Sequence, residues 1–276
     1  MGLYFVQHKG PADSERQQLV KCHGEPLELE LAANQPLAEA VAGAMEHSGF
    51  ETAWLEIADV PVEKLSYVIP AESPDDDHVA WYSDTKSFGT GRIKRLGMIV
   101  GKHQSATFIH GHGSWHALEG KTKFGHVLAG DTVLATGVRA KGIGIRCAVF
   151  ERSHDAETKF DLFKIREIAT SGGDHALLRL KPNVELVKGI EQALQQLGWQ
   201  RANVSGLGSL AGAVFEDGSR MTSFATEFLI TDYLAGEGAV PEIMIVGETD
   251  GDIMTGTLTA DQNPILVTAE LVLNRI

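Results

Sequence analysis

One internal repeat constrains the fold of this chain more than any other feature of its sequence. Residues 29–55 align with residues 178–204 without a gap. The matched pairs, each 149 residues apart, include Leu31 and Leu180, Asn34 and Asn183, Leu37 and Leu186, Val41 and Ile190, Gly49 and Gly198, and Phe50 and Trp199. Chance matches of this length are rare, so the sequence predicts two copies of one structural unit.

Each copy predicts a strand, a helix and then a run of antiparallel strands. A short alternating segment leads to an asparagine, Asn34 or Asn183, that is suited to capping a helix. Apolar residues then recur at helical spacing. A glycine follows in each copy, Gly49 or Gly198, at the position where a left-handed residue typically ends a helix. The segments after each glycine are rich in residues that favour strands.

A cluster of histidines in the first copy predicts a metal site. In the segment "FIHGHGSWHALEG", residues 108–120, His110 and His112 are two positions apart, so on a strand both project from the same face. His126 begins the next predicted strand, and antiparallel pairing would bring it opposite the pair. Three imidazoles with one open position are typical of a catalytic zinc site rather than a closed structural one.

Comparison of the two copies indicates that the fold does not require these histidines. At the positions that match them, the second copy has Val246, Glu248 and Thr257. A pair of histidines two residues apart is common by itself, but the corresponding strands are built without imidazoles. The histidines therefore indicate a specific function in the first copy.

Further polar residues are candidates for work beside the metal. His116 and Glu119, both in the loop predicted at residues 113–124, are candidates for a fourth ligand or for proton transfer. Basic side chains near these segments are candidates for binding a carboxylate. They are Arg92, Arg95, Lys121 and Lys123, with Arg16 reaching in from the N-terminal arm.

The composition excludes several classes of protein. With 24 basic and 37 acidic residues, the net charge is −13, and nucleic-acid binding needs a positive surface. The two cysteines, Cys22 and Cys147, are far apart and suggest neither a disulfide framework nor a thiolate metal cluster. The sequence contains neither a long apolar run typical of a membrane span nor the pattern of an export leader, so we expect a cytoplasmic protein.

Two segments resemble the plant and prokaryote conserved (PPC) domain. Residues 178–210, "LRLKPNVELVKGIEQALQQLGWQRANVSGLGSL", are similar to its opening strand, its helix and a strand that ends in GxGS. Residues 108–133, "FIHGHGSWHALEGKTKFGHVLAGDTV", are similar to its histidine segment. The resemblance covers almost the whole chain as two tandem copies. Residues 1–155 carry the histidines after a short N-terminal arm, and residues 172–276 lack them.

The resemblance implies an α+β fold in which each copy is an antiparallel sheet flanked by a helix. It also implies assembly as a homotrimer and a zinc ion held by His110, His112 and His126. In plants the domain accompanies AT-hook segments of DNA-binding proteins, but this chain has no Arg-Gly-Arg-Pro hook. The segments "HGHGSW" and "FGH" depart from the family's usual runs. A cupin is the rival fold, but the spacing from His112 to Glu119 and the repeated helix argue against it.

Together these patterns predict a metal-binding protein, with zinc or another divalent transition metal, that acts as an enzyme on a small anionic metabolite. Two alternatives are a DNA-associated or regulatory PPC-domain protein and a ligand-sensing module with a structural zinc. The sequence indicates neither the reaction nor the substrate.

Overall fold

The computed structural model describes residues 4–169 and 172–276, and they fold mainly into β-structure. Strands account for 57% of the residues and helices for 9%, and the described residues contain two helices. The predicted α+β fold of two domains, each a separate sheet flanked by a helix, is therefore wrong. One large mixed sheet of 17 strands runs through the described parts of both halves instead.

The first half is residues 4–169 and the second half is residues 172–276. The first contains β1 (Gln17–Leu31), α1 (Leu37–Ser48), β2 (Thr52–Val68), β3 (Pro70–Ala71), β4 (Trp81–Tyr82), β5 (Lys86–Phe88), β6 (Gly91–His103), β7 (Ala106–Ala117), β8 (Lys123–Val127), β9 (Val133–Leu134), β10 (Val138–Arg146), β11 (Ala148–His154) and β12 (Asp161–Glu167). The second contains β13 (His175–Leu180), α2 (Leu186–Leu197), β14 (Ala202–Val214), β15 (Arg220–Asp232), β16 (Leu234–Ala235), β17 (Glu242–Val246), β18 (Ile253–Thr257) and β19 (Ile265–Arg275).

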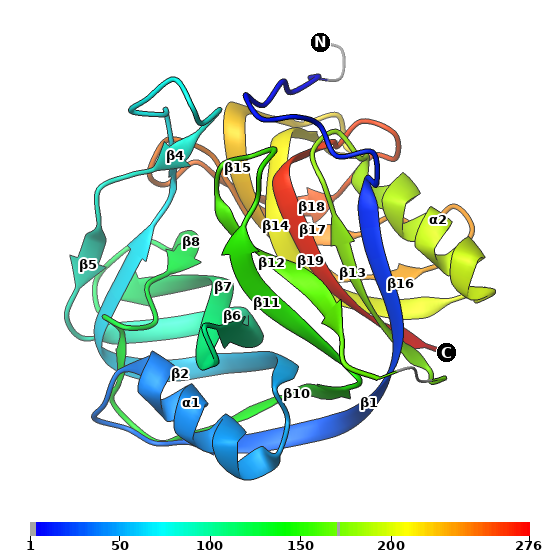
Figure 1. Cartoon of the computed structure of the whole chain (residues 1–276). Coiled ribbons are helices and arrows are strands. Elements are labelled where there is room, and N and C mark those ends of the chain that lie inside the picture. Colours follow the sequence, from blue (N-terminus) through cyan, green and yellow to red (C-terminus); the bar gives the residue numbers. More distant parts are fainter. Residues whose placement is uncertain (1–3, 170–171) are drawn as a thin grey trace.

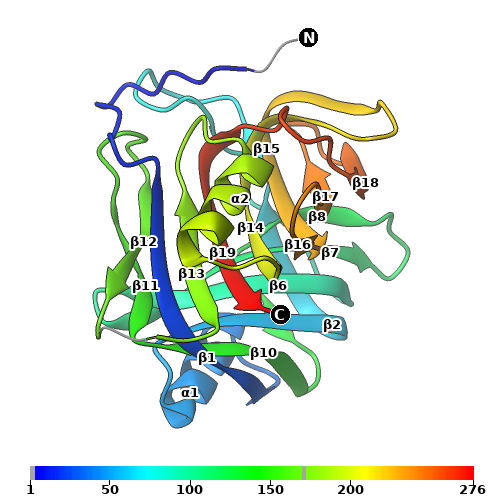
Figure 2. The ribbon, with the colours of Figure 1, turned by 90° about the vertical axis from the view of Figure 1, so that its right-hand side faces the viewer.

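The length of β1 explains why one sheet forms instead of two. Residues 17–22 of this strand pair with β13, and residues 23–31 pair with β10. Because the strand has 15 residues, it reaches both halves, and its hydrogen bonds join their sheets edge to edge. Figure 2 shows β1 running from the side of α2 down to α1, and Figure 1 shows the two helices on different sides of the molecule.

Strands pair in the same order in the two halves. In the first half the order is β8, β7, β6, β2, β10 and β1, all antiparallel. In the second half it is β18, β17, β15, β14, β19 and β13, again all antiparallel. Along the chain, α1 follows β1 and α2 follows β13, the last strand in each order. Each half therefore has the same arrangement of helix and strands.

The helix ends follow one prediction and contradict another. Gly49 and Gly198 end α1 and α2 in the left-handed conformation, with φ of 73° and 67°, as predicted. The predicted asparagine caps are wrong, because Asn34 and Asn183 lie before the helices, also at positive φ. The carboxylate of Glu185 caps α2 by accepting a hydrogen bond from the Lys188 backbone N–H.

Apolar residues of both halves share a core. One cluster of buried side chains includes Trp54, Leu55 and Trp115 of the first half together with Leu207 and Leu229 of the second. A second cluster lies within the second half under α2. Burial of apolar surface stabilises the packed state, so the shared cluster fixes one half against the other. Within the described residues, no helix is long and apolar enough to span a membrane.

Buried charges also connect the halves. Arg179 of β13, which is 1% exposed, donates a hydrogen bond of 2.8 Å to Asp155, which follows β11. Burial acts to raise the pKa of Asp155, but hydrogen bonds from Arg179 and Thr158 outweigh it and lower the pKa to about 2. The pair is therefore ionised at neutral pH.

Candidate metal centre

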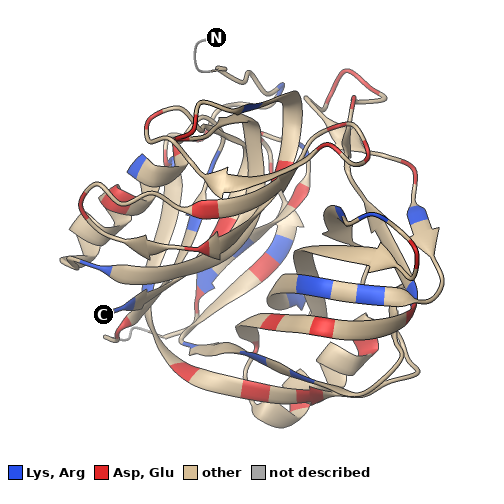
Figure 3. Ribbon diagram, turned by 180° about the vertical axis from the view of Figure 1, so that it is seen from behind, with Lys and Arg blue, Asp and Glu red and all other residues tan. Residues whose placement is uncertain are grey.

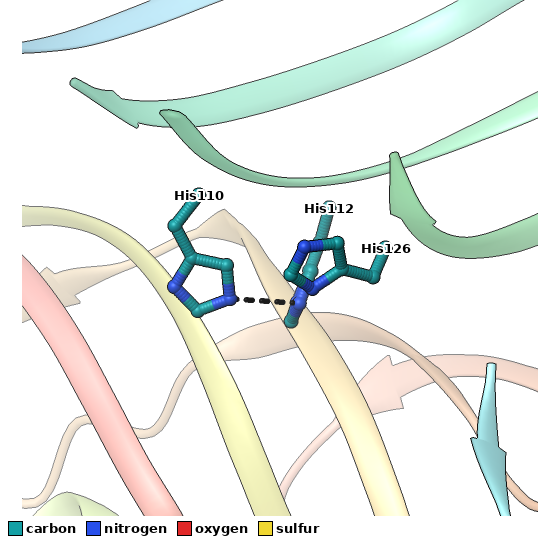
Figure 4. Close-up of side chains that lie close together, drawn as sticks. All are labelled: His110, His112 and His126. Atoms are coloured by element: carbon teal, nitrogen blue, oxygen red, sulfur yellow. Dashed lines mark hydrogen bonds between the residues drawn. The ribbon is translucent and has the colours of Figure 1, made fainter. Parts of the chain in front are cut away.

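The three predicted histidines lie together on the hairpin of β7 and β8. His112 and His126 are direct partners in the antiparallel register, and His110 lies two residues before His112 on the same face. One nitrogen from each imidazole lies within 4.8 Å of the others. His112 is 1% exposed, and the other two are half-buried. Figure 4 shows the three rings turned toward one another.

Hydrogen bonds to the outer ring nitrogens orient two of the imidazoles. The Nδ1 of His110 lies 2.7 Å from the Glu270 carboxylate, and the Nδ1 of His112 lies 2.9 Å from the Phe228 carbonyl oxygen. A carbonyl oxygen or an ionised carboxylate only accepts, so both Nδ1 atoms carry the proton. The Nε2 atoms of both rings are then free to bind a metal, which is the arrangement that metal-ligating histidines use.

The inner nitrogens fit a metal ion. The Nε2 atoms of His110 and His112 face each other at 3.2 Å (Figure 4). With both Nδ1 atoms protonated, two lone pairs oppose each other unless a proton or a cation lies between them. Two ligands of a tetrahedral zinc ion at about 2.0–2.1 Å lie roughly 3.3 Å apart, close to the separation seen here. In addition, His126 Nδ1 is buried and has no hydrogen-bond partner among the described residues.

Two carboxylates that the sequence analysis missed complete the surroundings of the histidines. Glu270 of β19 is 1% exposed and binds His110. Glu227 of β15 is 5% exposed, and its Oε1 lies 3.5 Å from His112 Nε2 and 3.6 Å from His126 Nδ1. Both come from the second half. The available signal was a glutamate in each of two apolar strands, "FATEFLI" and "VTAELVL", where a buried charge requires a partner.

The pKa values reflect this burial of opposite charges. Burial acts to lower the pKa of His112, but the nearby Glu227 carboxylate outweighs it and raises the pKa above the usual value. Burial lowers the pKa of His126 to about 4. Burial acts to raise the pKa of both glutamates, yet His112 lowers that of Glu227 and His110 lowers that of Glu270. Both carboxylates are thus ionised, and a divalent cation would balance their two charges.

A cavity gives access to the histidines. It has a volume of about 490 Å³ and includes His110, His126 and Glu270 in its wall. Arg152 and Lys159 also line it. Three aromatic side chains, Trp81, Tyr82 and Phe160, line both this cavity and a neighbouring one that reaches His112 and Glu227. A ligand in this space would contact apolar rings, two basic side chains and the histidines.

The other predicted site residues lie elsewhere, and none of them lines these two cavities in the described structure. Arg95 binds Glu56 at 3.0 Å, and Arg92 lies 3.1 Å from Asp59. Lys123 lies 3.2 Å from Asp250, Arg16 lies 2.8 Å from Glu157, and Lys121 is exposed. Glu119 is exposed in the turn after β7, and His116 lies near the end of β7 with its Nδ1 close to the Ala117 carbonyl. Their predicted roles at the site gain no support from these positions.

Comparisons with known proteins give similarities of structure alone. No family model and no curated protein matches the sequence. A metal-containing protein from Archaeoglobus fulgidus is 18% identical, and the match covers 51% of this chain and 93% of that one with a TM-score of 0.39. A PPC protein from Pyrococcus horikoshii is 14% identical over 57% of this chain and 100% of its own, with a TM-score of 0.39. A protein from Ralstonia eutropha, named as a proposed DNA-binding protein, is 12% identical over 54% of this chain and 90% of its own, with a TM-score of 0.35.

Proposed function

We propose that the chain binds one divalent transition metal through His110, His112 and His126 and is an enzyme that acts on a small anionic metabolite. The observation that carries the proposal is the pair of Nε2 atoms facing each other at 3.2 Å, with both Nδ1 atoms held by acceptors. Imidazole nitrogens suit zinc, iron, nickel and copper, and zinc is the metal that we expect.

The residues around the histidines support a role in chemistry. A bound ion of this kind supplies a Lewis acid that activates water or polarises a carbonyl group. Glu270 holds the His110 ring in its orientation. Arg152 and Lys159, in the wall of the same cavity, would bind a carboxylate or phosphate, and the aromatic residues would exclude water from a bound ligand.

The test of metal binding is elemental analysis of the purified protein, followed by equilibrium dialysis with Zn²⁺. We expect one metal ion per chain in the wild-type protein and a melting temperature that falls when the ion is removed by a chelator. Protein that takes up no Zn²⁺, Ni²⁺, Fe²⁺ or Mn²⁺ and whose melting temperature is unchanged by chelation would contradict the proposal.

The test of the anion site is binding of a small dianion to metal-loaded protein, measured by calorimetry with oxalate as the probe. We expect binding that weakens on Lys159→Met and Arg152→Met, whereas Arg92→Met leaves it unchanged because Arg92 lies outside the cavity. Equal weakening by all three variants would contradict a role for the cavity residues.

We also propose that residues 1–155 and 172–276 derive from one duplicated unit and that the second copy lacks a metal site of its own. The identical order of strand pairing in the two halves supports this origin. A cytoplasmic location and a homotrimer remain predictions, and light scattering of the purified protein tests the assembly.

The charge distribution of the chain does not favour nucleic acid as a partner. The net charge is −13, and basic and acidic residues lie on adjacent strands of one face rather than in a single positive patch (Figure 3). We expect no gel shift of duplex DNA at physiological salt. A shift that weakens steeply with added salt would favour the DNA-associated alternative instead.

A further inference from the structure

We propose that Glu227, from the second half of the chain, is a fourth protein ligand of the metal ion that the three histidines bind. The inference rests on the proposed metal binding and goes further by assigning a ligand that lies more than 100 residues away in sequence. The site would then be built by both halves, because the first half contributes three imidazoles and the second contributes the carboxylate.

The position of the Glu227 carboxylate fits this role. Its Oε1 is almost equidistant from two inner nitrogens, at 3.5 Å from His112 Nε2 and 3.6 Å from His126 Nδ1. These distances are too long for good hydrogen bonds, which lie near 2.7–3.2 Å. They are close to the roughly 3.3 Å that separates two ligands of one zinc ion. One oxygen thus lies beside two imidazole nitrogens at the spacing of neighbouring ligands.

The burial of Glu227 supports the same conclusion. The side chain is at least nine-tenths buried, and its Oε2 has no hydrogen-bond partner among the described residues. His126 Nδ1, the nitrogen nearest to this carboxylate, also has none in the part of the chain described. A buried carboxylate oxygen without a hydrogen-bond partner is costly. A cation bound between the carboxylate and the imidazoles would satisfy both groups.

Glu270 differs from Glu227 and provides the matched control. Its carboxylate accepts from His110 Nδ1, on the side of the ring away from Nε2, and from the Thr268 hydroxyl. The imidazole ring of His110 therefore lies between Glu270 and the inner nitrogens. Glu270 orients a ligand, whereas Glu227 is placed to be one.

A fourth protein ligand narrows the class of ion. Three imidazoles and a carboxylate would fill a tetrahedral site, so only a five- or six-coordinate ion would keep a position open toward the cavity. Carboxylate ligands suit harder ions such as Mn²⁺ and Fe²⁺. Imidazole ligands bind iron and nickel as well as zinc. Zinc, the ion that we expect, would have to expand to five-coordination before a molecule in the cavity could bind it.

The experiment compares Co²⁺ binding by wild-type protein, Glu227→Ala, Glu227→Gln and Glu270→Gln, with visible absorption as the spectroscopic readout. We expect Glu227→Ala and Glu227→Gln to lower Co²⁺ affinity by more than about 100-fold and to change the visible bands. Glu270→Gln should lower affinity by about 10–100-fold and leave the bands as in wild type. Added formate should restore the wild-type bands to Glu227→Ala by filling the vacated position, and it should leave Glu270→Gln unchanged.

The outcomes separate this inference from the proposed function. If wild-type protein binds Co²⁺ and both Glu227 variants bind it with wild-type affinity and bands, Glu227 is not a ligand and the three-histidine site stands. If wild-type protein binds no metal, the proposed function and this inference both fail. Circular dichroism of the metal-free variants checks folding, and the isosteric Glu227→Gln decides the question if Glu227→Ala does not fold.

Discussion

The hairpin of β7 and β8 and the hairpin of β17 and β18 occupy the same place in the strand order of their halves, but they differ in chemistry. In the first, His112 is paired with His126. In the second, the register pairs Glu242 with Thr257. The sequence alignment matched Val246 and Glu248 with His110 and His112, and the strand register corrects that part of the alignment. Neither the sequence alignment nor the register places an imidazole in the second hairpin.

The difference teaches that the two halves divide one site between them. The half without histidines contributes Glu227 and Glu270, which contact the histidines of the other half. One half therefore presents imidazole nitrogens, and the other presents buried carboxylates. Without the second half, the cluster would lose the carboxylates that orient His110 and that would balance a cation.

Breaking the buried ion pair between the halves should have the largest effect. Asp155→Asn leaves the Arg179 guanidinium, which is 1% exposed, without its charged partner. We expect the free energy of unfolding to fall by about 3–5 kcal/mol, measured by urea denaturation. Glu28→Gln, which removes an exposed partner of Arg139 and Lys141, should cost about 0–1 kcal/mol. Similar losses from the two variants would show that the buried pair does not tie the halves together.

Removing one imidazole tests the histidine side of the comparison. His126→Gln breaks no hydrogen bond of His126 Nδ1 to the described residues, so the variant should fold. It should nevertheless bind Zn²⁺ more than about 100-fold more weakly in equilibrium dialysis, because losing a ligand costs more than losing an outer partner. His116→Ala on the same hairpin is the control and should bind normally. Normal binding by His126→Gln would remove His126 from the site.

Acid should weaken the contact between the halves in a defined pH range. Asp155 has a folded pKa of about 2 against an ordinary value of 3.8, so it contributes stability that is present above pH 3.8 and lost as the pH falls through 2. The contribution is about 2 kcal/mol. Subtracting the pH profile of Asp155→Asn from that of wild type should isolate this decline in unfolding experiments. A difference that does not change over this range would mean that the pair adds no pH dependence.

Substitutions at the two helix ends test whether the halves share the same local structure. We expect them to have the smallest effect on stability. Gly49→Ala and Gly198→Ala each place a side chain at positive φ, where nothing else lies within 4 Å of the new Cβ. Each should cost about 1 kcal/mol in thermal unfolding, because the left-handed conformation is strained for residues with a Cβ. Gly43→Ala, inside α1 and equally unobstructed, should instead stabilise the protein by roughly 0.5–1 kcal/mol. Unequal costs at the two caps would indicate that the helix ends are not equivalent.

Local patterns in the sequence predicted part of the site well. The spacing of His110 and His112 fixed their common face, because side chains two positions apart on a strand project together. Antiparallel pairing brought His126 opposite His112 as predicted, although His126 lies near the end of β8 and not at the start of the strand. The predicted basic residues lie away from the histidines in the structure. Arg92, Arg95 and Lys123 are near the histidines in sequence, but each has an acidic partner outside the cavity.

The sequence by itself determined the repeated helix with its glycine cap and the three histidines on one hairpin, because these depend on contacts between near neighbours along the chain. Only the tertiary structure decided that β1 joins the halves into one sheet and that Glu270 lies 160 residues from the histidine it binds. Such contacts join residues that are far apart in the sequence, and no periodicity within either segment encodes which distant strands meet.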